Sequence, residues 1–382
     1  MIKNWTQVTL GEIATLKQGF ALNKKSDHYI SKEPTQFPLL KISDLFNNTE
    51  TLFVKQTIPK QFLVGPSEII YSRTGQVGYA FTGKSGVVYN NCFKVIPNEK
   101  VDSIFLFHIL NSQPVRQLAK VLATGTAQPD LNHGAFKSIK ILIPPLPTQH
   151  KIASILTAYD DLIENNLKRI KLLEEKAQLM YEEWFVRLRF PGHEEVKIDE
   201  ETGLPEGWER IKLIDCCILT MGQSPKSIYY NEERKGLPFH QGVKDYSFRF
   251  PTNSTWSTEG NRLAKENSIL FSVRAPVGRL NVAMEDLILG RGLAAINHKA
   301  GYNSFLYYQL QNIFYKDNLM GGGAIFNSVT KKDVEGIKLI HAPNKIEERY
   351  ESTVSKIDLI IKKLTQENTI LKEARDILLP RL

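Results

Sequence analysis

The sequence is poor in the residues that build metal and redox sites. Only three of its 382 residues are cysteine, and the spacing of Cys92, Cys216 and Cys217 fits neither a zinc motif nor a CxxC pair. The eight histidines are scattered, without an HExxH pair or a Cys/His cluster. We therefore expect reduced thiols and no metal site.

Long uncharged runs are missing as well. No stretch is apolar for long enough to span a bilayer. The N-terminal segment MIKNWTQVTLGEIATL has no apolar core followed by a small-residue cleavage site, so it does not match a secretory signal. We expect a cytoplasmic protein with no membrane partner. There is also no Asp/Asn-Pro-Pro-aromatic tetrapeptide of an amino-methyltransferase and no SAM-binding glycine motif.

The net charge of +8 is unevenly distributed along the chain. Residues 1–145 carry 16 basic and 9 acidic side chains, a net +7, and residues 210–343 carry 17 and 11, a net +6. Between them, residues 191–209 hold one lysine against seven acids. Two matched basic blocks favour a polyanionic partner such as DNA, and the acidic connector is expected to lie away from it.

An internal repeat explains the two blocks. Trp5 and Gly19 match Trp208 and Gly222 at an offset of 203, and SEIIYSRTGQVG from Ser67 matches SILFSVRAPVG from Ser268 at an offset near 200. FLFHIL at Phe105 matches FLYYQL at Phe305. Because the matches keep their order while the offset drifts slightly, the chain contains a duplicated domain with small loop changes.

Each copy is predicted to be α+β. Segments such as EIIYS, GVVYNNCFKVI and SILFSV are β-branched or aromatic and are bounded by Gly or Pro, which predicts strands. The segments SIFLFHILNSQPVRQLAKVL and NSFLYYQLQNIFYKDNL carry apolar residues at helical spacing.

A long helix is predicted after each copy, and each would be about 36 residues or roughly 54 Å long. The apolar positions step by four and three residues from Ile152 to Trp184, and again from Tyr350 to Leu382. This is a heptad pattern, so the two helices are expected to pair as an antiparallel coiled coil that relates the copies by a pseudo-twofold axis. Asn166 and Asn368 interrupt the two seams, either as buried residues that fix register or as residues at a solvated rim.

The stretch GYAFTGKS, Gly78 to Ser85, matches the phosphate-binding P-loop pattern. A working P-loop lies between a strand and a helix. Here the next residues, GVVYNNCFKVIP, are β-branched without a helical period, and the second copy has GRLNVAME instead. A turn between two strands is therefore the better interpretation, with a P-loop NTPase kept as the alternative function.

Several short motifs recur along the chain in a characteristic arrangement. They are SVRAPVG and its partner SRTGQVG, together with PPLPTQHKIASIL, YEEWFVRLRFP, GLPEGWE and ILLPRL in that order. With these motifs the whole chain resembles the specificity subunit of type I restriction–modification systems. It implies two target recognition domains, at 1–145 and within 191–343, and two spacer helices, at 146–190 and 344–382. A coiled-coil protein scaffold without DNA binding is the other alternative.

The resemblance further implies a non-catalytic subunit that reads one half of an asymmetric bipartite site in double-stranded DNA with each domain. The helices would set the spacing and dock two adenine-N6 methyltransferase subunits, and restriction subunits would complete the nuclease. This chain would bind no cofactor, because SAM, ATP and Mg²⁺ would belong to those partners.

Base and phosphate contacts are expected from polar loops beside the predicted strands. No catalytic or metal-binding residue is assigned. In the first copy the candidates are Lys24, Lys25, Arg73, Thr74, Gln76, Lys84, Gln128 and Asn132. In the second copy they are Lys226, His240, Gln241, Lys244, Arg274, Arg279, Arg291 and Asn327.

Overall fold

The computed structural model describes residues 5–125, 127–316 and 328–378, which form two compact units. Unit 1 runs to residue 165 and resumes at residue 368, and unit 2 covers residues 166–367. Each unit therefore contains one copy of the repeat together with a part of both long helices. The long helices α6 (Leu146–Tyr181) and α10 (Asn344–Leu378) begin at the residues predicted from the sequence.

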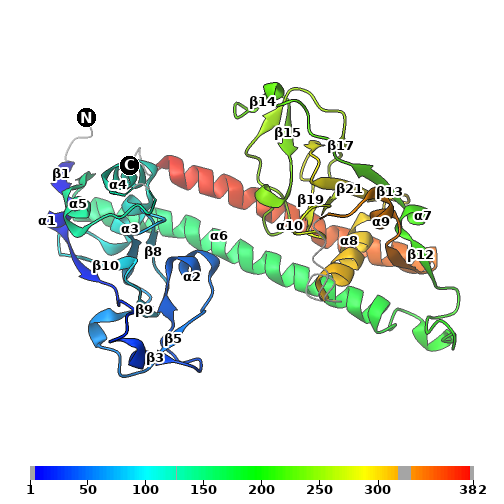
Figure 1. Cartoon of the computed structure of the whole chain (residues 1–382), viewed down its shortest axis with the longest axis horizontal. Coiled ribbons are helices and arrows are strands. Elements are labelled where there is room, and N and C mark those ends of the chain that lie inside the picture. The colour runs from blue at the N-terminus through cyan, green and yellow to red at the C-terminus, as the bar shows by residue number, and fades with distance from the viewer. Residues whose placement is uncertain (1–4, 126, 317–327, 379–382) are drawn as a thin grey trace. The chain divides into compact units, whose positions relative to one another are not determined.

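A four-stranded antiparallel sheet lies at the centre of unit 1 (Figure 1). Its strand order is β2 (Ala14–Gln18), β10 (Cys92–Pro97), β7 (Ile69–Ser72) and β8 (Ala80–Phe81). A smaller sheet has the order β4 (Leu39–Leu40), β9 (Gly86–Val88) and β6 (Leu63–Val64). Two ribbons pair β1 (Thr6–Thr9) with β11 (Lys140–Ile143) and β3 (Ile30–Ser31) with β5 (Phe53–Val54).

Apart from its segments of α6 and α10, the helices described in unit 1 are short. They are α1 (Leu10–Ile13), α2 (Ile42–Asn47), α3 (Ser103–Asn111), α4 (Gln113–Leu122) and α5 (His133–Ser138), with 3₁₀ turns at Asp27–Tyr29 and Lys60–Phe62. The helical segment predicted from Ser103 divides at Ser112, where the backbone is extended. Pro114 explains the division, because proline lacks an N–H and its ring clashes with the carbonyl one turn earlier in a continuous helix.

Unit 2 repeats this plan. The central sheet has the order β13 (Cys217–Met221), β21 (Leu293–His298), β18 (Ile269–Ser272) and β19 (Leu280–Val282), and β12 (Glu209–Lys212) pairs with β22 (Lys338–His341). A five-stranded sheet has the order β14 (Tyr230–Asn231), β16 (Trp256–Ser257), β15 (Leu237–His240), β20 (Leu287–Leu289) and β17 (Leu263–Ala264). The helices are α7 (Leu213–Cys216), α8 (Asn303–Gln311) and α9 (Lys331–Glu335), with 3₁₀ turns at His193–Glu195, Ser227–Tyr229 and Val243–Asp245.

The predicted duplication is confirmed, and the structure explains one of its glycines. A Cβ atom on Gly19 would lie 2.2 Å from the carbonyl oxygen of Tyr89, and one on Gly222 would lie 2.1 Å from that of Gly290. Both distances are far shorter than the van der Waals contact distance. The same backbone crossing therefore excludes any side chain in both copies.

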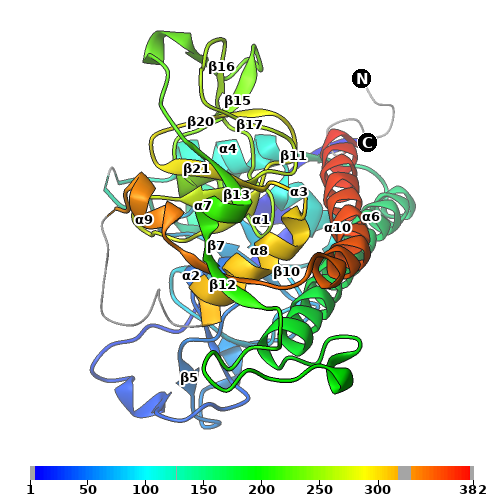
Figure 2. The ribbon, with the colours of Figure 1, turned by 90° about the vertical axis from the view of Figure 1, so that its right-hand side faces the viewer.

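The two long helices run antiparallel within each unit (Figures 1 and 2). In unit 1 the Asn368 amide lies 3.4 Å from the carbonyl oxygen of Ile163, and Arg375 donates to Asp160 at 2.6 Å. In unit 2 the Tyr350 hydroxyl donates to the carbonyl of Ala177 at 2.9 Å. The described positions of the predicted seams are buried except for seven at intermediate exposure, which are Tyr159, Leu173, Met180, Trp184, Leu371, Arg375 and Leu378. Leu382 lies outside the described residues.

Asn166 and Asn368 are each 4% exposed, so the interpretation that they lie at a solvated rim is wrong. The central helix also ends differently from the prediction. Its last turn, Glu182–Val186, is a π-turn, and the predicted extension to residue 190 is not helical. A second π-turn, Asn312–Lys316, follows α8.

The GYAFTGKS stretch lies in a strand–turn–strand arrangement. It includes β8, and a turn leads from there directly into β9. No helix begins at the motif, so the P-loop interpretation is wrong. Within the described ranges, no helix is apolar enough over sufficient length to cross a membrane, and no three His, Cys, Asp or Glu side chains gather as metal ligands.

Candidate nucleic-acid interface

The loop after β7 and the loop after β18 are built in the same way. In unit 1 the Ser72 hydroxyl accepts from the Tyr79 backbone N–H at 2.9 Å, and in unit 2 Ser272 accepts from Arg279 at 2.8 Å. The glycine before each donor has a positive φ, +99° at Gly78 and +83° at Gly278, a conformation that favours glycine. The shared serine and glycine therefore close a loop whose tip points away from the sheet.

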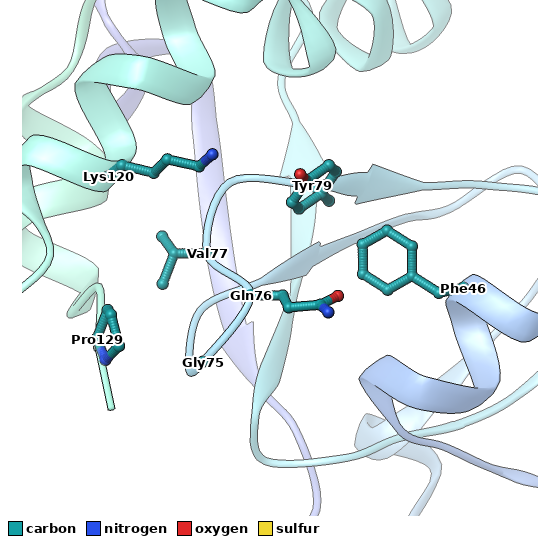
Figure 3. Close-up of a pocket in the computed structure, with 7 residues that line it drawn as sticks. All are labelled: Phe46, Gly75, Gln76, Val77, Tyr79, Lys120 and Pro129. Carbon is teal, nitrogen blue, oxygen red and sulfur yellow. The ribbon is translucent and has the colours of Figure 1, made fainter. Parts of the chain in front are cut away.

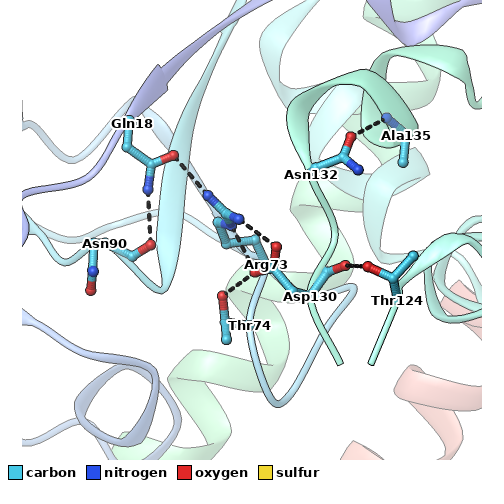
Figure 4. Close-up of polar contacts among 8 residues, drawn as sticks. All are labelled: Gln18, Arg73, Thr74, Asn90, Thr124, Asp130, Asn132 and Ala135. Carbon is cyan, nitrogen blue, oxygen red and sulfur yellow. Dashed lines mark hydrogen bonds and ion pairs between the residues drawn. The ribbon is translucent and has the colours of Figure 1, made fainter. Parts of the chain in front are cut away.

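Arg73 braces this loop in unit 1 (Figure 4). Its guanidinium makes two bonds to the Asp130 carboxylate, Nε to Oδ1 at 3.1 Å and Nη2 to Oδ2 at 2.5 Å. Nη1 donates to Gln18 at 3.0 Å, and the Thr74 hydroxyl donates to Asp130 at 2.6 Å. Three of the five guanidinium N–H groups are thus engaged within the protein.

The surroundings of the Arg73–Asp130 ion pair, which we call the brace, favour its charged form. Partial burial raises the pKa of Asp130, but the hydrogen bonds from Arg73 and Thr74 outweigh it, so this pKa is lowered. The pKa of His133 is also lowered, by burial and then by the Arg73 charge. Asp130 is therefore a carboxylate at neutral pH, and it positions Arg73 and Thr74 at the base of the loop.

The equivalent place in unit 2 has different chemistry. The Leu131 N–H donates to the carbonyl of Arg73 at 2.8 Å, and the Val329 N–H donates in the same way to Val273 at 2.9 Å. Arg73 therefore corresponds to Val273, and Asp130 corresponds to Ser328. The bidentate ion pair has no counterpart there, and Arg274, which occupies the place of Thr74, is exposed.

Three of the predicted residues in unit 2 lie on adjoining loops. The Val273 N–H donates to Gly292 at 2.9 Å, and the Gly292 N–H donates to Gln241 at 3.0 Å. These bonds bring together the loops that carry Arg274, Arg291 and Gln241, all three of which are exposed. Arg279 is exposed in the same region, beside the loop closed by Ser272.

The prediction that His240 contacts a base is wrong for this conformation. Its side chain is fully buried, with Nε2 2.9 Å from Oδ1 of Asn253 and Nδ1 3.4 Å from the Asp245 carboxylate. Its place at the end of β15 points the imidazole into the domain. Asn132 has a structural role as well, because its side chain caps α5 by accepting from the Ala135 N–H at 2.9 Å.

Six further predicted residues lie on the surface. Lys84 contacts Asn48 and is partly exposed. The other five are exposed: Lys24, Lys25, Gln128, Lys226 and Lys244. Asn327 lies outside the described residues.

A pocket of about 640 Å³ opens beside the tip of the braced loop in unit 1 (Figure 3). Its lining comprises Phe46, Gly75, Gln76, Val77, Tyr79, Lys120 and Pro129. The guanidinium of Arg116 lies 5.2 Å and Nζ of Lys120 lies 6.0 Å from the centre of the Tyr79 ring. Of these residues, the sequence analysis identified only Gln76.

Arg116 and Lys120 could have been found, because they are one turn apart on an amphipathic helix and therefore share a face. Phe46 and Tyr79 carried no comparable signal. They lie far apart in the sequence, and their rings meet edge-to-face at 4.9 Å only in the folded domain.

Comparison with known proteins agrees with this architecture. A family model described as the type I restriction modification DNA specificity domain matches residues 2–175 and again residues 205–373. A putative type I restriction enzyme MjaX specificity subunit from Methanocaldococcus jannaschii is 33% identical over 291 residues, covering 75% of this chain and 68% of the relative. The MjaIX specificity subunit of the same organism is 25% identical over 406 residues, covering 100% and 93%.

The fold is also found in a solved structure. The S subunit of a type I restriction–modification system from M. genitalium matches with a TM-score of 0.61 at 19% identity, covering 98% of this chain and 95% of that one. The two family matches together span most of the chain, one copy in the globular part of each unit. The chain therefore belongs to the family of type I restriction–modification specificity subunits, with two target recognition domains.

Proposed function

We propose that the recognition domain of each unit reads one half of an asymmetric, bipartite site in double-stranded DNA. The observation that carries this is the pair of homologous loops with different chemistry. In unit 1 Arg73 is fixed by Asp130, whereas in unit 2 the corresponding position is Val273 and Arg274 is exposed. Two copies of one scaffold with different loop residues are suited to two different half-sites.

The distribution of charge supports DNA as the partner. The two recognition domains carry the two basic blocks of the sequence. Exposed lysines such as Lys24, Lys25, Lys226 and Lys244 can approach phosphates, which fixes the register of a protein on a duplex without reading its sequence. Binding should therefore weaken steeply as the salt concentration rises.

The long helices present apolar side chains that their mutual packing leaves exposed. On α6 these are Leu146, Ile155, Leu162, Leu167, Leu172 and Leu179, and on α10 they are Leu359, Ile360, Ile370 and Ile377. These exposed side chains provide apolar surface in each unit with which another protein can associate. We assign this surface to the docking of two methyltransferase subunits, with restriction subunits joining the same complex.

Catalysis is assigned to those partner subunits. They would bind SAM for adenine-N6 methylation, and ATP and Mg²⁺ for restriction, while this chain in the cytoplasm supplies DNA specificity without a cofactor of its own.

Reconstitution of the chain with methyltransferase subunits tests the proposal. The complex should bind one bipartite sequence more tightly than other duplexes. A complex with the Arg274→Ala variant should lose its base preference in one half-site only. Arg187→Ala serves as the control, because Arg187 is exposed and its guanidinium pairs with Glu183 on the same helical turn. If the wild-type complex shows no preference among duplexes, the proposal fails.

A further inference from the structure

The pocket at the loop tip of unit 1 combines an amide, exposed aromatic surface and positive charge. Gln76 is exposed, and its side chain extends toward the Phe46 ring, while Lys120 reaches toward Tyr79 (Figure 3). Phe46 itself is 42% exposed, which is unusual for a phenylalanine in a folded domain. The polar and apolar groups thus open onto the same hollow.

We propose that this pocket reads one A·T base pair through its major-groove edge. The Gln76 amide would accept from N6 and donate to N7 of the adenine, and the Phe46 ring would contact the 5-methyl group of the thymine. Lys120 would meet a flanking phosphate. The inference rests on the proposed function, which it deepens by naming a base pair and the two side chains that select it.

The ring geometry argues against a different use, the stacking of an extruded base. Such a base would need a slot between roughly parallel rings. Instead, Phe46 meets Tyr79 at 4.9 Å with an interplanar angle of 79°, and it meets Phe81 at 5.1 Å and 89°. These edge-to-face contacts close the space between the rings. What remains accessible is the outer surface of Phe46, which suits contact with a methyl group at the edge of a base pair.

The loop holds Gln76 in a defined place. The Gly75 N–H donates to the carbonyl of Pro129 at 2.8 Å, and the brace of Arg73 on Asp130 lies directly below. Beyond the tip the space is open, since a Cβ on Gly75 would meet no atom within 4 Å. A side chain on a loop whose backbone is held in this way discriminates between bases better than one on a flexible loop.

The pocket should act in one half-site only. At the offset of 200 that relates Ser72 and Gly78 to Ser272 and Gly278, Gln76 corresponds to Pro276 and Tyr79 to Arg279. Proline offers no side-chain hydrogen bond. Unit 2 therefore cannot read adenine from this place.

A pool of duplexes with randomised sequence, bound to the complex with its methyltransferase subunits, tests the inference. With Gln76→Ala, preference for A·T should fall about 5- to 150-fold at a single position of one half-site. Base preference at all other positions and the length of the unread gap between the half-sites should be unchanged. Gln76→Glu should shift that position toward cytosine, whose N4 donates to a carboxylate. Gln7→Ala, at an exposed glutamine of β1 outside the pocket, is the matched control.

A uracil substitution isolates the contact of Phe46. Replacing the thymine of that pair by uracil removes one methyl group, and binding of the wild-type complex should weaken about fourfold. The Phe46→Ala complex should bind both duplexes equally, whereas Phe46→Leu should keep part of the difference.

Three results would overturn the inference while the wild-type complex remains sequence-selective. They are unchanged preference at every position in Gln76→Ala, a uniform loss of binding to all sequences, or no difference between thymine and uracil. Failure of the proposed function would look different, because the wild-type complex itself would then select no sequence.

Discussion

Replacement of Arg249 by alanine should lower the free energy of unfolding of unit 2 substantially. Its side chain is 3% exposed and lies 2.8 Å from the carboxylate of Asp358 on α10 and 3.7 Å from that of Glu174 on α6. The guanidinium also lies 3.6 Å from the centre of the Tyr307 ring. One arginine of the recognition domain thus joins both long helices within the unit.

Arg249→Ala would leave two partly buried carboxylates, 12% and 18% exposed, without a counter-charge between them. Removing one partner of a buried ion pair costs about 3–5 kcal/mol, and loss of the contact with Tyr307 adds to this. Burial and the Asp358 charge already act to raise the pKa of Glu174, which is about 7, against the lowering effect of Arg249. The variant should therefore be destabilised more at pH 8 than at pH 5.

Denaturant unfolding of the full chain, followed by tryptophan fluorescence, measures this effect. Trp184, Trp208 and Trp256 lie in unit 2 and Trp5 lies in unit 1, so the signal reports mainly on unit 2. Arg187→Ala removes an exposed ion pair in the same unit and should cost less than about 1 kcal/mol. A loss below about 1 kcal/mol for Arg249→Ala would show that Arg249 does not stabilise unit 2 through a buried ion pair.

Three further predictions follow from the same contacts. Since burial raises the pKa of Glu174 from 4.5 to about 7, the folded state holds this proton more tightly than the unfolded state does, and the free energy of unfolding should fall by about 2–3 kcal/mol as pH rises from 5 to 8. Glu174→Gln should flatten that profile in pH-dependent unfolding. Asp130→Ala removes the partner of Arg73 and should weaken discrimination between bases in the half-site of unit 1 alone, as measured by selection from randomised duplexes. Loss of sequence preference in both half-sites would contradict this. Lys84→Ala should leave the purified chain with the same background ATP hydrolysis as the wild type, because no helix follows the glycine-rich stretch. A measurable drop in ATP hydrolysis would restore the interpretation of this stretch as a nucleotide site.

The duplication and the long helices were predictable because their signals are local and periodic. Heptad spacing locates buried positions such as Ile163 and Val354 without knowledge of the partner helix. The division of the helical segment at Ser112 was also predictable, because Pro114 interrupts a continuous helix there.

The contacts that shape the site were not predictable from one sequence. Arg73 and Asp130 are 57 positions apart, and nothing in their spacing indicates that they pair. His240 was expected in a polar loop, but it ends a strand and faces Asn253 inside the domain. Both outcomes depend on how distant segments pack, which short motifs do not encode.

A map of methylated adenines in cells with and without this chain, each expressing the methyltransferase subunits, tests the central claim most directly. We expect one asymmetric motif, made of two short halves separated by an unread gap of fixed length, that disappears when the chain is removed. Methylation that persists unchanged without the chain, or that falls on a continuous symmetric motif, would contradict the assignment of the two recognition domains to two half-sites.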